Sequence, residues 1–324
     1  MENSDKEKYL GDYISASGNN KDNIESRINK GYGIVADILA ILEEVPLGKH
    51  KLEIGLLLRQ ALFLNGILYN SEAWSTFSEK DIESIEKIDE YLLRSLLKGH
   101  SKAPLEMLHL ETGTLPVKYI IAMRRLLYHH NIISRNESEL ICKVYSAQKI
   151  NPKKGDWINL LKNDFDLIGE TIDDETIKSL KKNKYKILIK DKIRKAAFAF
   201  LEQKKASHSK VEHIIYDALK PQDYIVSDKF SNENVKLLYR LRTRTTDVKC
   251  NFKTQFKENL HCSLGCFEEE TQQHLLSCKP IIDKLPLRQG VIAYEDIFDS
   301  QKQLDAVNWF SRLFEVREEL MSSV

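Results

Sequence analysis

Four potential metal ligands lie within seventeen residues of the 324-residue sequence, in the order Cys262-x3-Cys266-x7-His274-x3-Cys278. Zinc prefers four tetrahedral nitrogen or sulfur ligands, and a Cys3His set with a short first loop is a common structural solution. Gly265 suits the tight turn that this loop needs, and one helical turn would place His274 and Cys278 on the same face. Because protein fills all four positions, the spacing predicts a structural zinc ion rather than a catalytic one.

Other assignments of these residues stay open at the level of the sequence. Cys250 or His261 could replace one member of the set, although neither improves the spacing. The thiols could also be incidental buried residues, with His274 at the surface. Cys142 lies in an apolar helical pattern and is expected in the core. Five cysteines in 324 residues disfavour a disulfide scaffold and favour an intracellular location, in the nucleus or the cytoplasm.

Hydrophobic periodicity predicts a mostly α-helical fold. Ile24, Ile28, Val35, Ile38 and Leu42 form one apolar stripe that should end at Pro46 and Gly48. A nearly all-apolar helix is expected over residues 49–69 and should be the most buried element. A third should be capped by Ser78 and Asp81, carry Ile82, Ile85, Leu92 and Leu96 on one face, and end at Gly99. Further helical patterns cover residues 117–134, 138–149, 156–168, 173–183, 185–205, 235–249 and 301–320.

A short extended segment over Tyr9–Ser15 precedes these helices, and turn residues follow it at Ser17–Asn20. Because a single strand leaves its edges unpaired, this one has either lost its partners or joins a small hairpin. The longest apolar run, residues 56–68, is interrupted by polar side chains and falls short of a membrane span.

Positive charge is concentrated in two blocks, although the whole chain has a net charge of only +1. Residues 178–210 contain twelve Lys/Arg against two acids, and residues 236–257 contain seven against one. Tyr239, Phe252 and Phe256 are interleaved with the second block. Basic residues neutralise phosphates and aromatic rings stack on unpaired bases, whereas a charge run can also be only a solvated helix face. Because the blocks flank the cysteine cluster, we expect RNA or DNA contacts from Arg124, Arg125, Lys181, Lys182, Lys184, Lys186, Lys190, Arg194, Lys195, Arg240, Arg242 and Arg244.

Sequence signatures of catalysis are missing. The chain has no Gly-rich phosphate loop, nucleophile elbow or HExxH helix, and its acidic pairs have no companion metal ligands nearby. His129-His130 follows Arg124-Arg125 on an expected helix, where the pair fits a basic face or interhelical packing. No catalytic residue is therefore assigned.

Several short motifs, taken in order, resemble the region that follows the polymerase palm in reverse transcriptases of non-LTR retrotransposons. The motifs are Tyr9-Leu10-Gly11-Asp12-Tyr13-Ile14, Arg27-Ile28, Leu68-Tyr69-Asn70-Ser71-Glu72-Ala73-Trp74, Asp89 with Leu93-Arg94, Leu110-Glu111-Thr112-Gly113 with Leu115-Pro116, Arg124-Arg125-Leu126, Gly155-Asp156-Trp157, Leu241-Arg242-Thr243-Arg244, Asn251-Phe252 and the Cys3His cluster. The resemblance covers the chain from about Tyr9 onward.

The resemblance implies a palm-edge remnant over residues 1–20, a helical thumb-like bundle over 21–150, a basic helical linker over 151–230, and a zinc-knuckle domain with a C-terminal helix over 231–324. The knuckle would help to grip an RNA template or target DNA, and Arg124 and Arg125 would approach a template–primer duplex. In such families the catalytic aspartates lie upstream of the Tyr-Leu-Gly segment, so the implied partner is a polymerase domain of the same element. A truncated copy, a split gene or a host-recruited fragment would each lack the upstream catalytic aspartates in this way. The short tail after the knuckle differs from relatives that carry an endonuclease there.

Two rival functions remain at this stage. In the first, the protein is a helical protein-interaction module whose zinc ion is purely structural, and its apolar stripes serve a protein partner. In the second, it is a cryptic nuclease, for which the sequence offers no candidate carboxylates. No membrane partner is expected.

Overall fold

The computed structural model of the chain describes residues 6–9, 12–15, 21–45, 51–75, 78–256, 259–285 and 292–322. These residues are mostly helical, as the periodicity predicted. Within the described ranges, the only sheet pairs β1 (Lys6–Tyr9) antiparallel with β2 (Asp12–Ser15). This pairing confirms the hairpin alternative for the N-terminal segment. The turn expected at 17–20 and the helix end expected at 46–48 lie outside the described residues.

The chain divides into two compact units, each assembled from separate stretches of sequence. Unit 1 comprises Met1–Glu44, Gly55–Leu92 and Leu115–Leu201, and unit 2 comprises Val45–Ile54, Leu93–Thr114 and Glu202–Val324. The boundaries expected at residues 150 and 230 fall inside unit 1 and unit 2, respectively. In the part of the chain that the structure describes, no helix is both long and apolar enough to cross a membrane.

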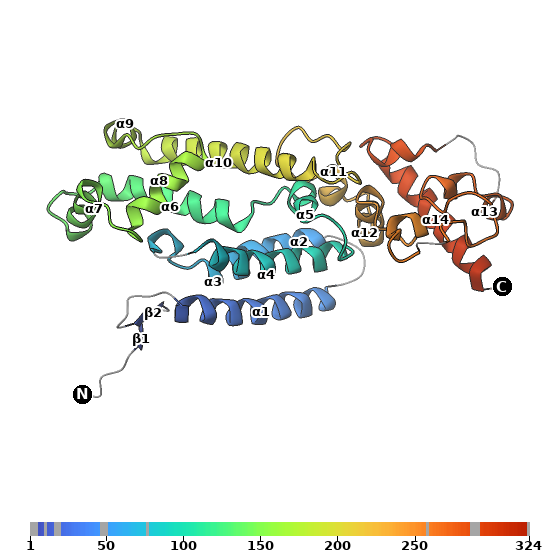
Figure 1. Cartoon of the computed structure of the whole chain (residues 1–324), viewed down its shortest axis with the longest axis horizontal. Helices are drawn as coiled ribbons and strands as arrows, with labels where there is room; N and C mark the ends of the chain where they lie inside the picture. Colours follow the sequence, from blue (N-terminus) through green and yellow to red (C-terminus); the bar gives the residue numbers. More distant parts are fainter. Residues whose placement is uncertain are drawn as a thin grey trace. The chain divides into compact units, whose positions relative to one another are not determined.

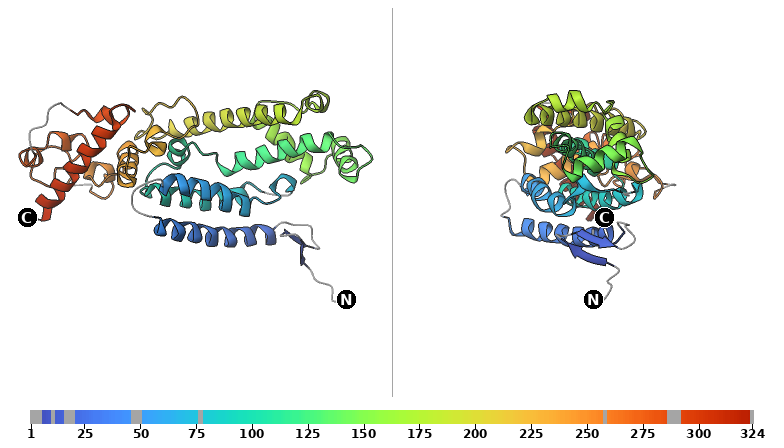
Figure 2. Two further views of the ribbon diagram at one scale, coloured as in Figure 1. Left: turned by 180° about the vertical axis from the view of Figure 1, so that it is seen from behind. Right: turned by 90° about the vertical axis from the view of Figure 1, so that its left-hand side faces the viewer.

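Besides the β1–β2 hairpin, unit 1 is built from helices, which Figures 1 and 2 show from three sides. Its elements, some of which continue into unit 2, are α1 (Lys21–Glu44), α2 (Lys51–Leu58), a π-helical turn η1 (Arg59–Leu64), α3 (Asn65–Ile67), η2 (Ser71–Ala73), α4 (Glu79–Leu97), α6 (Val117–Ile133), α7 (Leu140–Ile150), α8 (Trp157–Leu167), α9 (Asp174–Ser179) and α10 (Lys182–Lys205).

The first three expected helices pack together in unit 1, as predicted. A side chain at Gly31 of α1 would meet Ile67 at 2.8 Å and Ile88 at 3.2 Å, so glycine permits the close approach of these helices. Arg27 of α1 donates a hydrogen bond to the Ile67 carbonyl oxygen at 2.6 Å. The α1 stripe is buried at Ile24, Val35, Ile38 and Leu42.

The second expected helix differs from the prediction in two respects. It is interrupted by the π-helical turn η1, and Leu57 and Leu62 are 63% and 41% exposed, so it is not the most buried element. Arg59 in this turn is buried and forms a two-pronged ion pair with Asp89 of α4, at 2.6 Å and 2.5 Å. Sequence periodicity could not predict this pairing, because the partners are thirty residues apart.

The capping box predicted for α4 is confirmed. The Ser78 backbone N–H donates to the Asp81 carboxylate at 2.9 Å, and the Asp81 N–H donates to the Ser78 hydroxyl at 3.3 Å. At the other end, Lys98 adopts the left-handed conformation (φ +48°), one residue before the predicted terminator Gly99. Gly99 instead gives room to a neighbour, since a Cβ there would lie 2.8 Å from the Tyr239 ring.

Unit 2 combines several short helices and the 20-residue helix α14 with the cysteine cluster. Its elements are α5 (Leu105–Thr112), α11 (Asp223–Val226), α12 (Asn232–Arg242), η3 (Lys249–Phe252), η4 (His274–Leu276), α13 (Lys279–Ile282), η5 (Tyr294–Ile297) and α14 (Gln303–Ser322). The helix expected over 235–249 ends at Arg242, because the backbone turns left-handed at Arg244 (φ +50°).

A buried carboxylate organises the centre of unit 2. Glu111 of α5 is fully buried and accepts hydrogen bonds from Tyr216 (2.5 Å), Tyr224 (3.0 Å) and the Arg242 guanidinium (2.8 Å). Burial and the Glu111 charge hold the pKa of both tyrosines well above the ordinary value, so both remain donors. This network ties α5, α11 and α12 together.

Candidate metal centre and cationic surfaces

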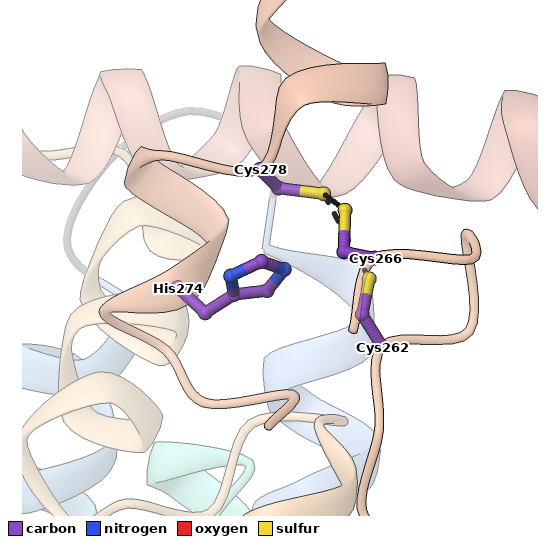
Figure 3. A group of neighbouring side chains, drawn as sticks. All are labelled: Cys262, Cys266, His274 and Cys278. Atoms are coloured by element: carbon purple, nitrogen blue, oxygen red, sulfur yellow. Dashed lines mark hydrogen bonds between the residues drawn. The ribbon is translucent and has the colours of Figure 1, made fainter. Parts of the chain in front are cut away.

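The four predicted metal ligands converge in unit 2. All their ligand atoms lie within 4.8 Å of one another, and Figure 3 shows the imidazole ring of His274 directed toward the three sulfur atoms. The sulfur of Cys278 is 3.8 Å from that of Cys262 and 3.5 Å from that of Cys266. A tetrahedral ion with metal–sulfur bonds of about 2.3 Å requires a sulfur–sulfur distance of about 3.8 Å. The geometry therefore fits a metal ion, and all three thiols are free of disulfides.

The backbone around the first two cysteines explains how the ligands are positioned. Cys262 donates its N–H to the Glu268 carbonyl at 2.9 Å, and Gly265 donates to the Cys262 carbonyl at 3.2 Å. Gly265 has a φ of +83°, which a residue with a side chain rarely adopts. This turn folds the segment back on itself and brings Cys266 beside Cys262.

The other two ligands do not share one helical turn, which corrects the sequence-based prediction. His274 begins the 3-10 turn η4, and Cys278 has an extended backbone conformation immediately before α13. The chain bends between them, since η4 ends at Leu276. Leu275 is fully buried and anchors this bend in the core of unit 2.

The imidazole of His274 is oriented as a metal ligand requires. Its Nδ1 lies 2.8 Å from a carboxylate oxygen of Glu268, which favours the tautomer with the proton on Nδ1. Its Nε2 is buried and has no hydrogen-bond partner. A carboxylate that receives the distal N–H of a ligating histidine is the usual second contact at metal sites. The buried Nε2 lone pair is thus available to a metal.

Without a bound metal ion, the environment of the cluster favours protonated thiols. Burial, the thiol of Cys266 and the proximity of Cys262 raise the pKa of Cys278, because thiolates this close repel one another. A divalent ion reverses this preference by attracting the thiolates. The four residues can therefore hold a metal ion with no open coordination position, as a structural site does.

A buried ion pair fastens the metal loop to α14. Glu270 is fully buried and accepts hydrogen bonds from the Ser263 backbone N–H at 2.7 Å and from Arg317 of α14 at 2.5 Å. Burial alone would raise the pKa of Glu270, but these hydrogen bonds outweigh it and lower the pKa. Glu270 therefore remains charged and bridges the loop to the helix.

The remaining cysteines and the alternative ligands lie outside the cluster. Cys250 contacts Glu269 through its sulfur at 3.6 Å, and His261 Nδ1 lies 3.1 Å from the Phe267 carbonyl oxygen. Neither belongs to the group of converging ligand atoms. Cys142 is buried and donates to the Ile132 carbonyl oxygen at 3.3 Å, as expected of a core thiol.

The cations expected to bind nucleic acid around α10 are at the surface. Those that are exposed are Lys181, Lys182, Lys184, Lys186, Lys190, Arg194 and Lys195. Lys195 forms an ion pair with Asp191 at 2.8 Å, one turn away. In the same helix, Tyr185, Ile189 and Ile193 are buried in unit 1. This amphipathic pattern fixes α10 with its basic side chains in solvent.

Arg125 and Arg242 are not at the surface, and the expectation that they contact nucleic acid was wrong. Arg125 is 4% exposed and forms an ion pair with Asp164 at 2.7 Å. Arg242 is 3% exposed and is paired with Glu111. Both guanidinium groups serve the cores of their units, because a buried charge requires a partner.

Besides Arg194, the three remaining nominated arginines are at least partly accessible. Arg124 is half-buried and donates hydrogen bonds to the Leu68 carbonyl oxygen and to Asn65, so it links α6 to α3. Arg240 is exposed and donates to the Lys98 carbonyl oxygen at 2.9 Å. Arg244 is partly exposed and follows the end of α12.

Two of the three aromatic residues of the second basic block are poorly placed for stacking, whereas Phe256 is partly exposed. Tyr239 is fully buried and Phe252 is 7% exposed. The sequence-based reasoning missed Phe267, which directly follows Cys266 and is 96% exposed. A phenylalanine between a metal ligand and three consecutive glutamates was the available signal.

His129 and His130 pack between helices, which was one of the two expectations. His129 Nε2 lies 3.0 Å from Tyr145 and from Asp174, and the His130 ring stacks on Tyr185. Burial would raise the pKa of Asp174, but hydrogen bonds from His129, Lys149 and Tyr145 lower it overall.

Comparisons of this chain with protein-family models, with curated proteins and with solved structures find no match. The resemblance to retrotransposon reverse transcriptases therefore remains a prediction from the sequence.

Proposed function

We propose that this protein binds RNA or DNA through the cationic face of α10, and that a structural zinc ion at Cys262, Cys266, His274 and Cys278 holds its second unit together. On this proposal the chain is a non-catalytic C-terminal region of a retroelement reverse transcriptase, with a thumb-like bundle, a basic helix and a zinc knuckle. The observation that carries the proposal is the exposed cationic face of α10.

The spacing along α10 supports a phosphate-binding surface. Lys182, Lys186, Lys190 and Arg194 recur every four residues, so they form one stripe on the helix. At 1.5 Å per residue this stripe extends over about 18 Å. The backbone of a nucleic acid can lie along such a line of cations. Each phosphate that they neutralise releases a counterion, and this release favours binding.

The metal module supplies an aromatic side chain suited to an unpaired base. Phe267 is almost fully exposed, and it lies in the loop between Cys266 and His274. Stacking of a base on an exposed aromatic ring contributes about 1–3 kcal/mol. We therefore expect single strands to bind more tightly than duplex.

The test of this proposal is a mobility-shift series with single-stranded RNA, single-stranded DNA and duplex DNA at low salt. The test variant replaces Lys182, Lys186 and Lys190 with glutamine, and the control variant replaces the exposed Lys143, Lys154 and Lys162 of the same unit. We expect the test variant to bind at least about tenfold more weakly and the control to remain near the native affinity. Equal affinities of the two variants would refute the role of α10.

The alternative function, a helical protein-interaction module, predicts a different result in the same assay. If the native protein binds none of the three nucleic acids at low salt, the proposal fails and this alternative stands. The identity of the metal is tested separately by elemental analysis of the purified chain. We expect about one zinc ion per chain, as the Cys3His donor set implies.

A further inference from the structure

A cationic cavity of about 510 Å³ lies within unit 2, beside the metal loop. One wall is formed by Glu269 and Thr271–Gln273, which lie between the metal ligands Cys266 and His274. The remaining lining residues come from distant parts of the sequence and are Lys102, Ser209, Lys210, Arg244, Cys250, Asn251, Phe252, Lys253, Thr254 and Tyr294.

The charges around this cavity are unbalanced. Four cations line it (Lys102, Lys210, Arg244 and Lys253), against the single carboxylate of Glu269. Among the described residues, none of these four cations forms an ion pair, in contrast to the buried arginines of unit 2. Like charges gathered in a concave surface repel one another, and an anionic ligand would relieve this repulsion.

Local contacts hold the cations in place around one aromatic ring. The Nζ of Lys102 lies 4.9 Å, and that of Lys210 6.0 Å, from the centre of the Phe252 ring. Lys210 also donates a hydrogen bond to the Asn251 carbonyl oxygen at 2.7 Å. Burial and the charges of Lys102 and Arg244 lower the pKa of Lys210, as expected for an ammonium group crowded by other cations.

The backbone at Arg244 is strained in a way that serves the cavity. Arg244 has a φ of +50°, a conformation that costs a residue with a side chain about 1–2 kcal/mol. This conformation ends α12 and redirects the chain, so that Arg244 lines the cavity instead of continuing the helix. Strained residues of this kind are concentrated at binding and catalytic sites.

We propose that this cavity binds the phosphate group of a nucleotide. Its volume lies in the range of small-ligand pockets, about 300–1,000 Å³, so it has room for more than an inorganic anion. Ser209, Thr254 and Gln273 offer neutral hydrogen-bonding groups for a sugar or a base. The nucleotide is either free in solution or part of a strand, and the experiment distinguishes these two sources.

This site goes beyond the function proposed for α10, because the cations that carry that function belong to unit 1. Either site could bind its ligand without the other. Glu269 and Thr271–Gln273 of the metal loop form part of the cavity wall.

The experiment measures binding of adenosine 5′-monophosphate and of a short single-stranded oligonucleotide to the full chain by calorimetry. The pocket variant combines Lys210→Gln with Arg244→Gln, and the control combines Lys220→Gln with Lys229→Gln, two exposed cations of unit 2 outside the cavity. A second pocket variant, Lys102→Gln with Lys253→Gln, changes only exposed side chains and preserves the test if the first variant does not fold.

If the pocket takes a free nucleotide, the pocket variants should bind the monophosphate at least about tenfold more weakly than the control does. If it takes a nucleotide of a strand, only the oligonucleotide affinity should fall by that factor. The variant of Lys182, Lys186 and Lys190 in α10 separates this proposal from nucleic-acid binding by α10. If the pocket takes a free nucleotide, the α10 variant should bind the monophosphate as well as the native protein does. If the pocket takes a nucleotide of a strand, the α10 and pocket substitutions should lower the oligonucleotide affinity additively. Native protein that binds neither probe, or pocket variants that bind both probes as well as the control does, would overturn the proposal.

Discussion

Removing the charge of Glu111 should strongly destabilise unit 2. In a Glu111→Gln variant, the buried guanidinium of Arg242 loses its only ionic partner among the described residues. The neutral amide also offers one acceptor oxygen in place of the two that receive hydrogen bonds from Tyr216, Tyr224 and Arg242. Breaking a buried pair by removing one partner costs about 3–5 kcal/mol, so we expect a loss of that size.

The assay is urea unfolding of the full chain in excess zinc, monitored by a spectroscopic signal that reports on unit 2. Glu233→Gln is the matched control, because the Glu233–Lys236 pair is at the surface, and it should change stability by less than about 1 kcal/mol. A double variant that adds Arg242→Met should recover part of the loss, since it removes the uncompensated charge. A loss below about 1 kcal/mol in Glu111→Gln would refute the reasoning.

Three further predictions concern the metal, the backbone and pH. Cys278→Ser should reduce the bound metal from about one ion per chain to nearly none, whereas Cys142→Ser should keep it, as measured by elemental analysis. Gly113→Ala should destabilise the protein more than Gly169→Ala, by about 1–3 kcal/mol in denaturant unfolding. Both glycines have a positive φ, but only at Gly113 would a Cβ collide with other atoms, 2.2 Å from the Pro221 nitrogen. Burial raises the pKa of Asp164 to about 6. The Asp164 carboxyl therefore binds its proton more tightly in the folded state than in the unfolded state. Protonation of Asp164 stabilises the fold fully below about pH 4, and this stabilisation is lost as the pH rises through about 6. The free energy of unfolding of the native protein, minus that of the Asp164→Asn variant, should therefore fall between about pH 4 and pH 6. A difference that does not change with pH would contradict the raised pKa.

The sequence predicted those features whose determinants are close together in the chain. The metal ligands fall within seventeen residues, and the capping pair Ser78 and Asp81 is three residues apart, so spacing alone indicated both. The helical pattern over residues 185–205 and the basic block over 178–210 likewise indicated a cationic helix, which the structure shows as α10 (Lys182–Lys205).

Features that depend on distant partners could not be predicted in this way. Arg125 and Arg242 look like surface cations in the sequence, and only the fold brings them to Asp164 and Glu111, 39 and 131 residues away. The positions of these acids in the sequence give no sign of the pairing.

The same limit applies to the cationic cavity. Its wall joins Lys102 with Lys210 and Arg244, which belong to three separate segments of the chain. The left-handed conformation of Arg244 had no sequence signal, since arginine rarely adopts it.

The most direct test of nucleic-acid binding by α10 is the salt dependence of single-strand affinity. Each phosphate contact on a single strand contributes about −0.7 to the slope of log K against log salt. The variant lacking Lys182, Lys186 and Lys190 should therefore have a slope shallower by about 2 than that of the native protein. A native slope near zero, or the same slope in the native protein and this variant, would contradict the account.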